Sequence, residues 1–435
     1  MVCSVVVGAG SGGCVAASRL SEDPECDVTL LEAGPPMAVG VGRRAVDDPD
    51  ALRALREQGR TYPDLAATRC GGGVALPYAA GRGVGGTSAV NAMLAMRGDS
   101  AQYTSWGWTD AEAMWRRVAI PAEQSADDEI GVVDRALLAA DERARRVPLT
   151  RRDGRRVTSA DAYLAPAADR TNLAVRADTS VDRVLLDGRR VEGVLLEDGT
   201  TVSADRVVLA AGALHTPALL LRSEVDAPGL GDGLQDHPSV AIALELRAGP
   251  AARDGFLAST VLELDDLQIL PLNHTDDGVH AGLAVALMRP IGRAGRVRLD
   301  PADPGGEPLV DLDLFADPRD LGRLRSGVRL LLDLLGRPPF RELVAEAYID
   351  DIGTGIDTLV DDASIDRWIR SAPGMYRHAT STCAIGTVLD QRGAVRGFEG
   401  LYVCDASALP GVPSANPHLP ITMMAERLAA QWSAT

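Results

Sequence analysis

The apolar positions at the start of the chain form an unbroken run rather than an alternating pattern. Residues 5–7 are three consecutive valines, which is typical of a strand buried on both faces of a parallel sheet. Apolar residues at helical spacing follow over 15–20, and the segment 27–32 predicts a second strand that ends in an acid. The order strand, helix, strand predicts an α/β arrangement at the N-terminus.

The middle of the chain predicts short strands joined by tight turns. Strands are expected at residues 181–186, 191–196, 200–203 and 206–211, and further along at 240–246, 281–288 and 295–299. The first three are joined by Asp187-Gly188 and Asp198-Gly199, which are hairpin turn signals. Apolar residues at helical spacing predict a core-facing helix over 318–335, and a short helix is expected over 361–369.

A glycine cluster of the form G-x-G-x-x-G lies between the first strand and the first helix. Gly8 permits a tight turn, Gly10 lets the backbone approach a pyrophosphate, and Gly13 lets the helix pack on the strand. Glu32 follows Gly13 by 19 residues, where an acid can bind ribose hydroxyls and disfavour the 2′-phosphate of NADP. We therefore expect a dinucleotide site at Gly8, Gly10, Ser11, Gly12, Gly13, Glu32 and Ala33.

This motif alone does not distinguish FAD from NAD. The hairpin strands predicted after residue 180 return to a buried strand at 206–211, followed by Gly212. A meander inserted in a Rossmann-like sheet is similar to the FAD domain of the glutathione-reductase type, whereas NAD domains continue the helix–strand alternation. The pattern favours FAD.

Charge and composition exclude several classes of function. The chain has 435 residues, with 44 basic and 61 acidic side chains and a formal net charge of −17, so it has no electrostatic footprint for nucleic acid. All of the basic residues are arginine, and the absence of lysine excludes a lysine Schiff base. We attribute the arginine bias to genome composition rather than to function.

The cysteines, the apolar runs and the first residues predict a soluble cytoplasmic protein. None of the six cysteines forms a C-x-x-C pair or joins a histidine at zinc-finger spacing, so we expect reduced thiols and no metal site. No apolar run is long enough to span a bilayer, and a strand starts where a signal peptide would lie. Contact with a membrane is expected only through an electron acceptor.

The stretch 81–91, G-R-G-V-G-G-T-S-A-V-N, resembles the first signature of the glucose–methanol–choline (GMC) oxidoreductases. The resemblance implies FAD contacts at Arg82, Gly85, Gly86, Thr87, Asn91 and Ala92. Some members carry, in this stretch, a histidine bonded covalently to the flavin, and Val90 stands at the matching position. The FAD is therefore expected to be noncovalent.

Other stretches resemble the same family in the same order along nearly the whole chain. They include G-A-L-H-T-P at 212–217, with a departure from the family pattern at 222–225, and G-L-G-D-G-L-Q-D-H-P at 229–238. The segments 405–407, 416–418 and 422–426 are similar to the family's FAD-binding C-terminal end. The likeness implies further cofactor contacts at Val181, Ala211, Gly212, Asp405, Ala406, Asn416, Pro417 and Thr422.

The implied fold is α/β, a discontinuous Rossmann-like FAD-binding domain of the glutathione-reductase type with an inserted sheet-plus-helix substrate domain. We expect residues 1–240 and 375–435 to form the FAD-binding domain and residues 241–374 the substrate-binding domain. The chain is short for this family, with abbreviated loops near 106–108 and 123–133. A compact member with this arginine bias suggests the subgroup associated with the redox peptide mycofactocin.

Two histidines lie within family motifs and are the expected catalytic residues. His378 begins H-A-T-S-T-C-A-I-G, which resembles the family's H-x-x-G-T-C-R-M-G, with Ser381 in place of a glycine. His418 stands 40 residues later, where members carry asparagine or histidine. A base near neutral pKa can remove an alcohol's hydroxyl proton as hydride leaves toward flavin N5. We assign His378 as base and His418 as hydrogen-bond partner, although the roles are open to exchange.

The predicted function is FAD-dependent oxidation of a small-molecule alcohol to an aldehyde or ketone. A dehydrogenase that passes electrons to a quinone or the respiratory chain is favoured, because short lid loops leave the flavin open to a bulky acceptor. Reduced mycofactocin is one candidate substrate. The alternatives are an alcohol oxidase that uses O2, a lyase like the FAD-containing hydroxynitrile lyases, which catalyse no net redox reaction, and a non-catalytic flavoprotein.

Overall fold

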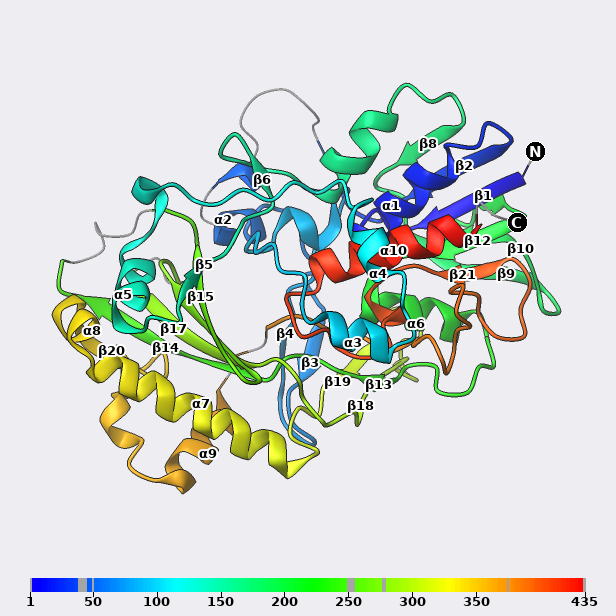
Figure 1. The fold of residues 1–435 in the computed structure, drawn as a ribbon. Helices are drawn as coiled ribbons and strands as arrows, with labels where there is room; N and C mark the ends of the chain where they lie inside the picture. Colours follow the sequence, from blue (N-terminus) through cyan, green and yellow to red (C-terminus); the bar gives the residue numbers. More distant parts are fainter. Residues whose placement is uncertain are drawn as a thin grey trace.

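The computed structural model describes residues 2–37, 45–48, 51–248, 255–275, 279–372, 374 and 376–432. Residue 375, where the second part of the predicted FAD-binding domain begins, lies outside these ranges. Two lobes lie side by side in Figure 1, one around the N-terminal strands and one around a larger antiparallel sheet.

The first lobe is organised by a parallel sheet of five strands in the order β21-β12-β1-β2-β8. Its strands are β1 (Val2–Val7), β2 (Cys26–Leu31), β8 (Leu173–Arg176), β12 (Arg206–Leu209) and β21 (Leu401–Val403). The consecutive valines of β1 are buried, as an apolar run in a central parallel strand requires. The helices α1 (Ser11–Leu20) and α10 (His418–Trp432) pack against each other beside this sheet (Figure 1).

The predicted meander forms a separate antiparallel sheet of three strands. It consists of β9 (Val181–Asp187), β10 (Arg190–Leu196) and β11 (Thr201–Ser203). Gly188 and Gly199 have positive φ angles of 58° and 84°, so both Asp-Gly turns use the backbone conformation that glycine favours. The hairpin prediction is confirmed, and the chain returns from it into β12, as expected.

The second lobe contains a six-stranded sheet in the order β20-β14-β17-β16-β15-β5. Its strands are β5 (Arg145–Arg146), β14 (Ser239–Leu246), β15 (Thr260–Leu264), β16 (Leu267–Leu272), β17 (Ala281–Leu287) and β20 (Val344–Tyr348). The helix α7 (Pro318–Gly336) packs on this sheet so closely that a Cβ on Gly327 would lie 2.8 Å from Val285 Cγ2. The leucine stripe of this helix is buried in the core, as predicted.

A third, smaller sheet has the order β13-β18-β19-β3-β4 and draws its strands from distant parts of the chain. They are β3 (Ala66–Thr68), β4 (Ala75–Pro77), β13 (Asp232–Leu234), β18 (Gly295–Arg298) and β19 (Leu309–Asp311). The expected domain boundaries stay a prediction. Strands β3 and β4 belong to the expected FAD-binding domain, yet β3 pairs with β19, which comes from residues 241–374, and β4 pairs with β3.

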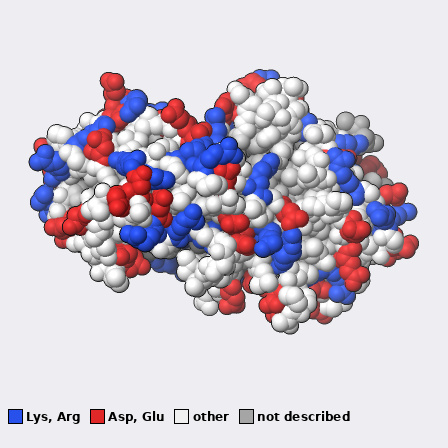
Figure 2. Space-filling model, turned by 90° about the horizontal axis from the view of Figure 1, so that it is seen from below, with Lys and Arg blue, Asp and Glu red and all other residues white. Residues whose placement is uncertain are grey.

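The remaining helices cover the sheets and connect the lobes. They are α2 (Ala51–Leu55), α3 (Ser100–Ser105), α4 (Ala111–Trp115), α5 (Val132–Ala140), α6 (Gly212–Arg222), α8 (Pro338–Leu343) and α9 (Asp362–Ser371), and a short hairpin joins β6 (Arg151–Arg152) to β7 (Arg155–Arg156). On the face in Figure 2, arginine and acidic side chains are interleaved rather than gathered into fields of one sign. Within the described ranges, no helix combines the length and the apolar character needed to cross a bilayer.

Candidate active site

A channel of about 1130 Å³ begins at the turn between β1 and α1. The predicted cofactor residues that line it are Gly8, Gly10, Ser11, Gly12, Glu32, Ala33, Arg82, Gly86, Thr87, Val181, Ala211, Gly212, Asp405 and Ala406. Three predicted contacts, Gly13, Gly85 and Thr422, line neither this channel nor the cavity that adjoins it. Thr422 is fully buried and its hydroxyl donates to the carbonyl oxygen of His418, 2.9 Å away.

The glycines at the start of α1 have different roles. A Cβ on Gly10 would meet only the carbonyl oxygen of Ala210, 4.0 Å away, so this residue leaves open space in the channel wall. A Cβ on Gly13 would lie 1.9 Å from the carbonyl oxygen of Gly8, so glycine is required there for the helix to pack. No side chain caps α1, and its first turn carries no acid, which leaves its N–H groups available to phosphate oxygens.

The carboxylate of Glu32 already accepts hydrogen bonds from backbone N–H groups of the surrounding loops. Its Oε2 accepts from the N–H of Ala9 at 2.7 Å, and its Oε1 accepts from Gly34 at 2.9 Å and Gly83 at 2.8 Å. A carboxylate has about four acceptor positions, so at most about one remains for a ribose hydroxyl. The expected ribose contact stays a prediction, while the observed role of Glu32 is to join three loops at the channel wall.

Asp405 is saturated in the same way. Its buried carboxylate accepts from the N–H of Gly212 and the hydroxyl of Thr216 through Oδ2, and from the N–H and hydroxyl of Ser407 through Oδ1. Burial raises the pKa of Asp405, and these hydrogen bonds oppose the shift. Asp405 therefore holds the start of α6 and the 405–407 turn together at the channel wall, and its carboxylate has no acceptor position left for the cofactor.

The loop that contains the 81–91 motif closes over the glycine turn. A Cβ on Gly86 would lie 2.6 Å from the Cα of Gly10, so the two glycine-rich segments touch backbone to backbone. The Oδ1 of Asn91 accepts from Arg156 Nη1 at 2.8 Å and from the N–H of Met93 at 3.0 Å. The amide nitrogen of Asn91 therefore remains as a donor in the adjoining cavity.

That cavity of about 730 Å³ continues the channel into the second lobe. The two spaces share lining residues, among them Ser11, Thr87 and Ala406. Asn91, Ala92, Asn416, Pro417, His378 and His418 line the cavity. The structure thus brings the two predicted catalytic histidines to one space, next to the expected dinucleotide site.

His378 is hydrogen-bonded to another histidine. The Nδ1 of His378 lies 2.8 Å from the Nδ1 of His237, and the Nε2 of His237 lies 2.9 Å from the carbonyl oxygen of Pro413. A carbonyl only accepts, so Nε2 of His237 carries a hydrogen. Burial lowers the pKa of His237 to about 4, so its ring is neutral and its Nδ1 is an acceptor.

The protonation of His378 follows from that of its neighbour. His378 must donate from Nδ1, which leaves Nε2 as its basic nitrogen. Burial, with a further contribution from His237, lowers the pKa of His378 well below its usual range, so the ring is neutral at pH 7. Within the described part of the chain, no group is hydrogen-bonded to Nε2 of His378. The residue is therefore arranged to accept a proton from a ligand in the cavity.

Asp236 and Tyr78 hold the backbone of this pair in place. Asp236 Oδ1 accepts from the N–H groups of His237 and His378 at 2.7 and 2.9 Å, and its Oδ2 accepts from the hydroxyl of Tyr78 at 2.9 Å. Burial raises the pKa of Asp236 to about 6 against the effect of these bonds. No catalytic role was predicted for these residues, although the Q-D-H-P stretch of 235–238 was the signal in the sequence that could have indicated one.

His418 lines the same cavity as His378, and its expected role as hydrogen-bond partner of the alcohol oxygen stays a prediction. Its Nε2 lies 3.2 Å from the hydroxyl of Ser159, and its Nδ1 is buried without a hydrogen-bond partner. Burial, and then the charge of Arg156, lowers the pKa of His418 to about 4. Among the described residues, no hydrogen bond joins His378 to His418. Asn416, which also lines the cavity, has a buried Oδ1 without a partner.

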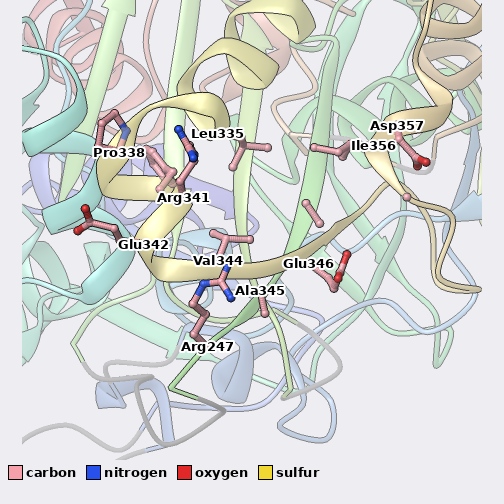
Figure 3. A pocket seen from close by; sticks show the side chains of 13 residues that line it. Arg247, Leu335, Pro338, Arg341, Glu342, Val344, Ala345, Glu346, Ile356 and Asp357 are labelled. Atoms are coloured by element: carbon pink, nitrogen blue, oxygen red, sulfur yellow. The ribbon is translucent and has the colours of Figure 1, made fainter.

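A separate hollow of about 750 Å³ lies by α8 and β20 (Figure 3). Its charged residues, among them Arg247, Arg341 and Glu346, come from the second lobe, and it shares no lining residue with the channel or the cavity. In the ranges that the structure describes, no cluster of histidine, cysteine and acidic side chains is arranged to hold a metal ion.

Comparisons with known proteins agree with this arrangement. The N-terminal model of the GMC oxidoreductases matches residues 2–136 and 141–239, and the C-terminal model matches residues 290–425. A GMC-type oxidoreductase of Rhodococcus erythropolis is 32% identical over 98% of this chain and 97% of its own length, and the 5-(hydroxymethyl)furfural oxidase of Methylovorus is 31% identical over the same shares. The crystal structure of pyridoxine 4-oxidase from Mesorbium loti has a TM-score of 0.88, with 24% identity and complete coverage of both chains.

The family models cover most of the chain, and the fold agrees along its whole length. The expected α/β fold and the expected family are therefore confirmed, and with the family the expectation of an FAD-dependent oxidoreductase. The alignment with the Rhodococcus protein spans 502 positions, so this 435-residue chain is shorter than its relative. The chain belongs to the GMC oxidoreductase family.

Proposed function

We propose that this protein oxidises an alcohol to an aldehyde or ketone, with FAD held noncovalently in the channel and the alcohol in the adjoining cavity. The observation that carries the proposal is Nε2 of His378, which has no hydrogen-bond partner within the described ranges and belongs to a residue that lines that cavity together with the 81–91 loop. The open wall at Gly10, the uncapped start of α1 and the buried Oδ1 of Asn416 are features that bound FAD would fill or satisfy. FAD would supply the hydride acceptor.

The chain's own residues would bind the alcohol and move its proton. Nε2 of His378 takes the hydroxyl proton. The hydrogen bond from Nδ1 of His378 to His237 keeps the ring in the tautomer that leaves Nε2 free to do so. We assign the Ser159 hydroxyl, 3.2 Å from Nε2 of His418, as the donor of that hydrogen bond, so that Nδ1 of His418 carries a hydrogen and stabilises the alkoxide oxygen. The amide of Asn416 helps to orient the same oxygen, and Val90 offers no side-chain nucleophile for a covalent bond to the flavin.

For the electron acceptor, we propose a quinone or a respiratory-chain component, and a cytoplasmic location for the protein. The support is the shortness of the chain, 435 residues against an alignment of 502 positions, together with the resemblance, which implies that loops near 106–108 and 123–133 are abbreviated and would leave the flavin more open. Relatives are named both as an oxidase and as an acceptor-dependent alcohol dehydrogenase, the latter from Pseudomonas putida at 26% identity. Release of hydrogen peroxide at the rate of turnover would favour the oxidase instead.

The proposal is tested by anaerobic reduction of the bound flavin, followed by loss of its absorbance. Simple alcohols, choline, sugars and reduced mycofactocin form the screen. We expect at least one alcohol to bleach the flavin, and His378→Ala to slow the reduction by about 10²-fold or more. His274→Ala is the matched control, because His274 lines neither the channel nor the cavity. A flavin that stays oxidised while a substrate is cleaved would indicate a lyase.

A further inference from the structure

One wall of the cavity is formed by three neighbouring strands of the six-stranded sheet. The registers pair Ala241 with Ala284 and Ala243 with Gly282 between β14 and β17. They also pair Ala284 with Leu270 and Gly282 with Leu272 between β17 and β16. All six residues line the cavity, in two rows: Ala241, Ala284 and Leu270, and Ala243, Gly282 and Leu272. We call these six residues the strand floor.

The strand floor is apolar and mostly flat. Four of its six positions carry a methyl group or no side chain, and none carries a polar atom. The alternating residues of β14, among them Ile242 and Leu244, are fully buried in the core of the second lobe, as the period of a strand requires. The backbone polar groups of the floor are paired within the sheet, so a ligand that lies on it finds no hydrogen-bonding or charged partner there.

Most polar groups of the cavity lie on other segments. Two border the strand floor: Ser239 begins β14, and Tyr348 of β20 pairs with Ala243 and donates its hydroxyl to Glu245 Oε2 at 3.1 Å. Tyr376 and His378 come from the segment before residue 380, while Asn416 and His418 come from the start of α10 and the residues before it. His418 is 8% exposed and its Nδ1 has no partner, which points to a polar ligand group at this end of the cavity. The cavity therefore has a polar side and an apolar side.

The charged side chains that line the cavity are exposed and lie outside the strand floor. Among the described residues they are Asp350, Asp351 and Arg377, all of them exposed. The carboxylate of Asp350 accepts from the N–H groups of Ile352 at 3.2 Å and Thr354 at 2.8 Å, so it closes its own turn. A charged ligand group on the strand floor would lose its hydration without gaining an ion pair there.

From this arrangement, we infer that the substrate is an alcohol whose hydroxyl is attached to a broad, uncharged, ring-sized apolar group. The inference rests on the proposed function and narrows it. The hydroxyl lies on the polar side near His378, and the ring lies on the strand floor, where small residues leave room for its width. Compact polar substrates such as sugars, and cationic ones such as choline, lack the apolar surface that this floor accepts.

The charge preference is tested with two alcohols of one shape. Choline and 3,3-dimethylbutan-1-ol differ in a quaternary nitrogen against a quaternary carbon. For anaerobic flavin reduction in the holoenzyme, we expect the neutral alcohol to have kcat/KM at least about 10-fold higher than choline, and cyclohexylmethanol to exceed ethanol by a similar factor. A higher kcat/KM for choline than for 3,3-dimethylbutan-1-ol would overturn the inference, as would a higher kcat/KM for ethanol than for cyclohexylmethanol.

Binding without chemistry separates this inference from the proposed function. Toluene and tetramethylammonium cannot be oxidised as alcohols, and their binding to the holoenzyme can be followed by calorimetry. We expect toluene to bind at least about 10-fold more tightly. If no alcohol reduces the flavin but toluene binds, the proposed function fails and the inference about the cavity stands; preferential binding of tetramethylammonium contradicts the inference itself.

Substitutions of Ala241 test the floor directly, because its side chain is exposed in the cavity. Ala241→Leu is expected to lower kcat/KM for cyclohexylmethanol by about 10-fold or more and to change that for ethanol by less than about 3-fold. Ala241→Asp is expected to shift the preference toward choline. Ala363→Leu, on the exposed face of α9, is the control for the added volume. Equal losses for both alcohols in Ala241→Leu would contradict a role in shape selection.

Discussion

The Nδ1 atoms of His237 and His378 lie 2.8 Å apart, and the carbonyl oxygen of Pro413 occupies the other ring nitrogen of His237. The bond to Pro413 makes Nδ1 of His237 an acceptor, so Nδ1 of His378 must donate to it. This leaves Nε2 as the basic nitrogen of His378, which lines the cavity. Hydrogen bonds to Pro413 and His237, rather than the pKa of His378, therefore determine which ring nitrogen of His378 can accept a proton.

We predict different results from two substitutions of His237 that have nearly the same shape. His237→Leu removes the acceptor for Nδ1 of His378 and should lower the rate of flavin reduction by about 10–100-fold. His237→Asn places an amide oxygen near the lost Nδ1 and should retain most of the rate. Nitrogen-15 NMR of labelled histidines reads the tautomer directly: we expect a protonated Nδ1 on His378 in the wild type and in His237→Asn. The same tautomer and rate in His237→Leu would rule out this positioning role.

Thermal stability should fall as the pH falls from 7.5 to 5. His237 and His418 have pKa values of about 4 in the folded chain and about 6.5 when unfolded. Below pH 6.5 the unfolded chain takes up protons that the folded chain excludes, so stability present above 6.5 is lost toward pH 4, by up to about 3 kcal/mol for each residue. Asp236, with a pKa raised to about 6, opposes this, because its own contribution is present below its unfolded pKa and is lost as the pH rises through 6.

The measurement for this prediction is the melting temperature as a function of pH. Burial also lowers the pKa of His378, so three histidines act against one aspartate and predict a net decrease in stability on acidification. His237→Asn should show a shallower decrease than the wild type. A melting temperature that is the same or higher at pH 5 would contradict the assignment of neutral, buried imidazoles.

Ser381→Gly should raise the free energy of unfolding by about 1 kcal/mol. Ser381 has a φ of 74°, a left-handed conformation that is strained for a residue with a Cβ, and it stands where the family pattern has glycine. Its hydroxyl makes only a 3.2 Å contact with the Thr380 hydroxyl. Denaturant unfolding provides the measurement, with Ser381→Ala as the control that keeps the strain. No gain from glycine, or an equal gain from alanine, would show that the backbone stores no strain here.

Substitutions at Gly10 and Gly13 should have different effects, the first on FAD binding and the second on the stability of the fold. Gly10→Val places its side chain in the open channel, so the variant should fold with a melting temperature near that of the wild-type apoprotein but retain little FAD after purification. Gly13→Ala brings a Cβ against the carbonyl oxygen of Gly8 and should lower the melting temperature of the apoprotein. Flavin absorbance and thermal unfolding measure the two effects. Full FAD content in Gly10→Val would contradict the assignment of the channel.

Local patterns in the sequence were sufficient for much of the fold. The valine run of β1, the helical spacing of α1 and the Asp-Gly turns of the meander each depend on neighbouring residues, and each was predicted correctly. Strand β16 was missed because Pro271 interrupts its pattern, although in the sheet this residue pairs with Leu283. Strand β20 follows α8 directly, without the turn residues that mark a boundary.

For the site, the motifs identified which residues face the cavity but not what each one does. Glu32 and Asp405 were expected to bind the cofactor, yet their carboxylates are largely or wholly occupied by backbone and hydroxyl groups of the channel wall. His418 was expected to hold the substrate oxygen beside His378, which stays a prediction, and the contact of its Nε2 with the Ser159 hydroxyl could not be read from the motif. A motif records the residue at a position, whereas its hydrogen bonds depend on which distant loops reach it.

The sequence by itself determined the first strand, helix and strand, the hairpin meander, the glycine turn and the family, because backbone preference and burial period are properties of short segments. Only the tertiary structure decided that His237 is the partner of His378, across 141 residues of chain, and that Ala241 lies beside Ala284. Contacts of this kind depend on how separate elements pack and on the register in which strands pair. Neither is encoded in the spacing of residues along one segment.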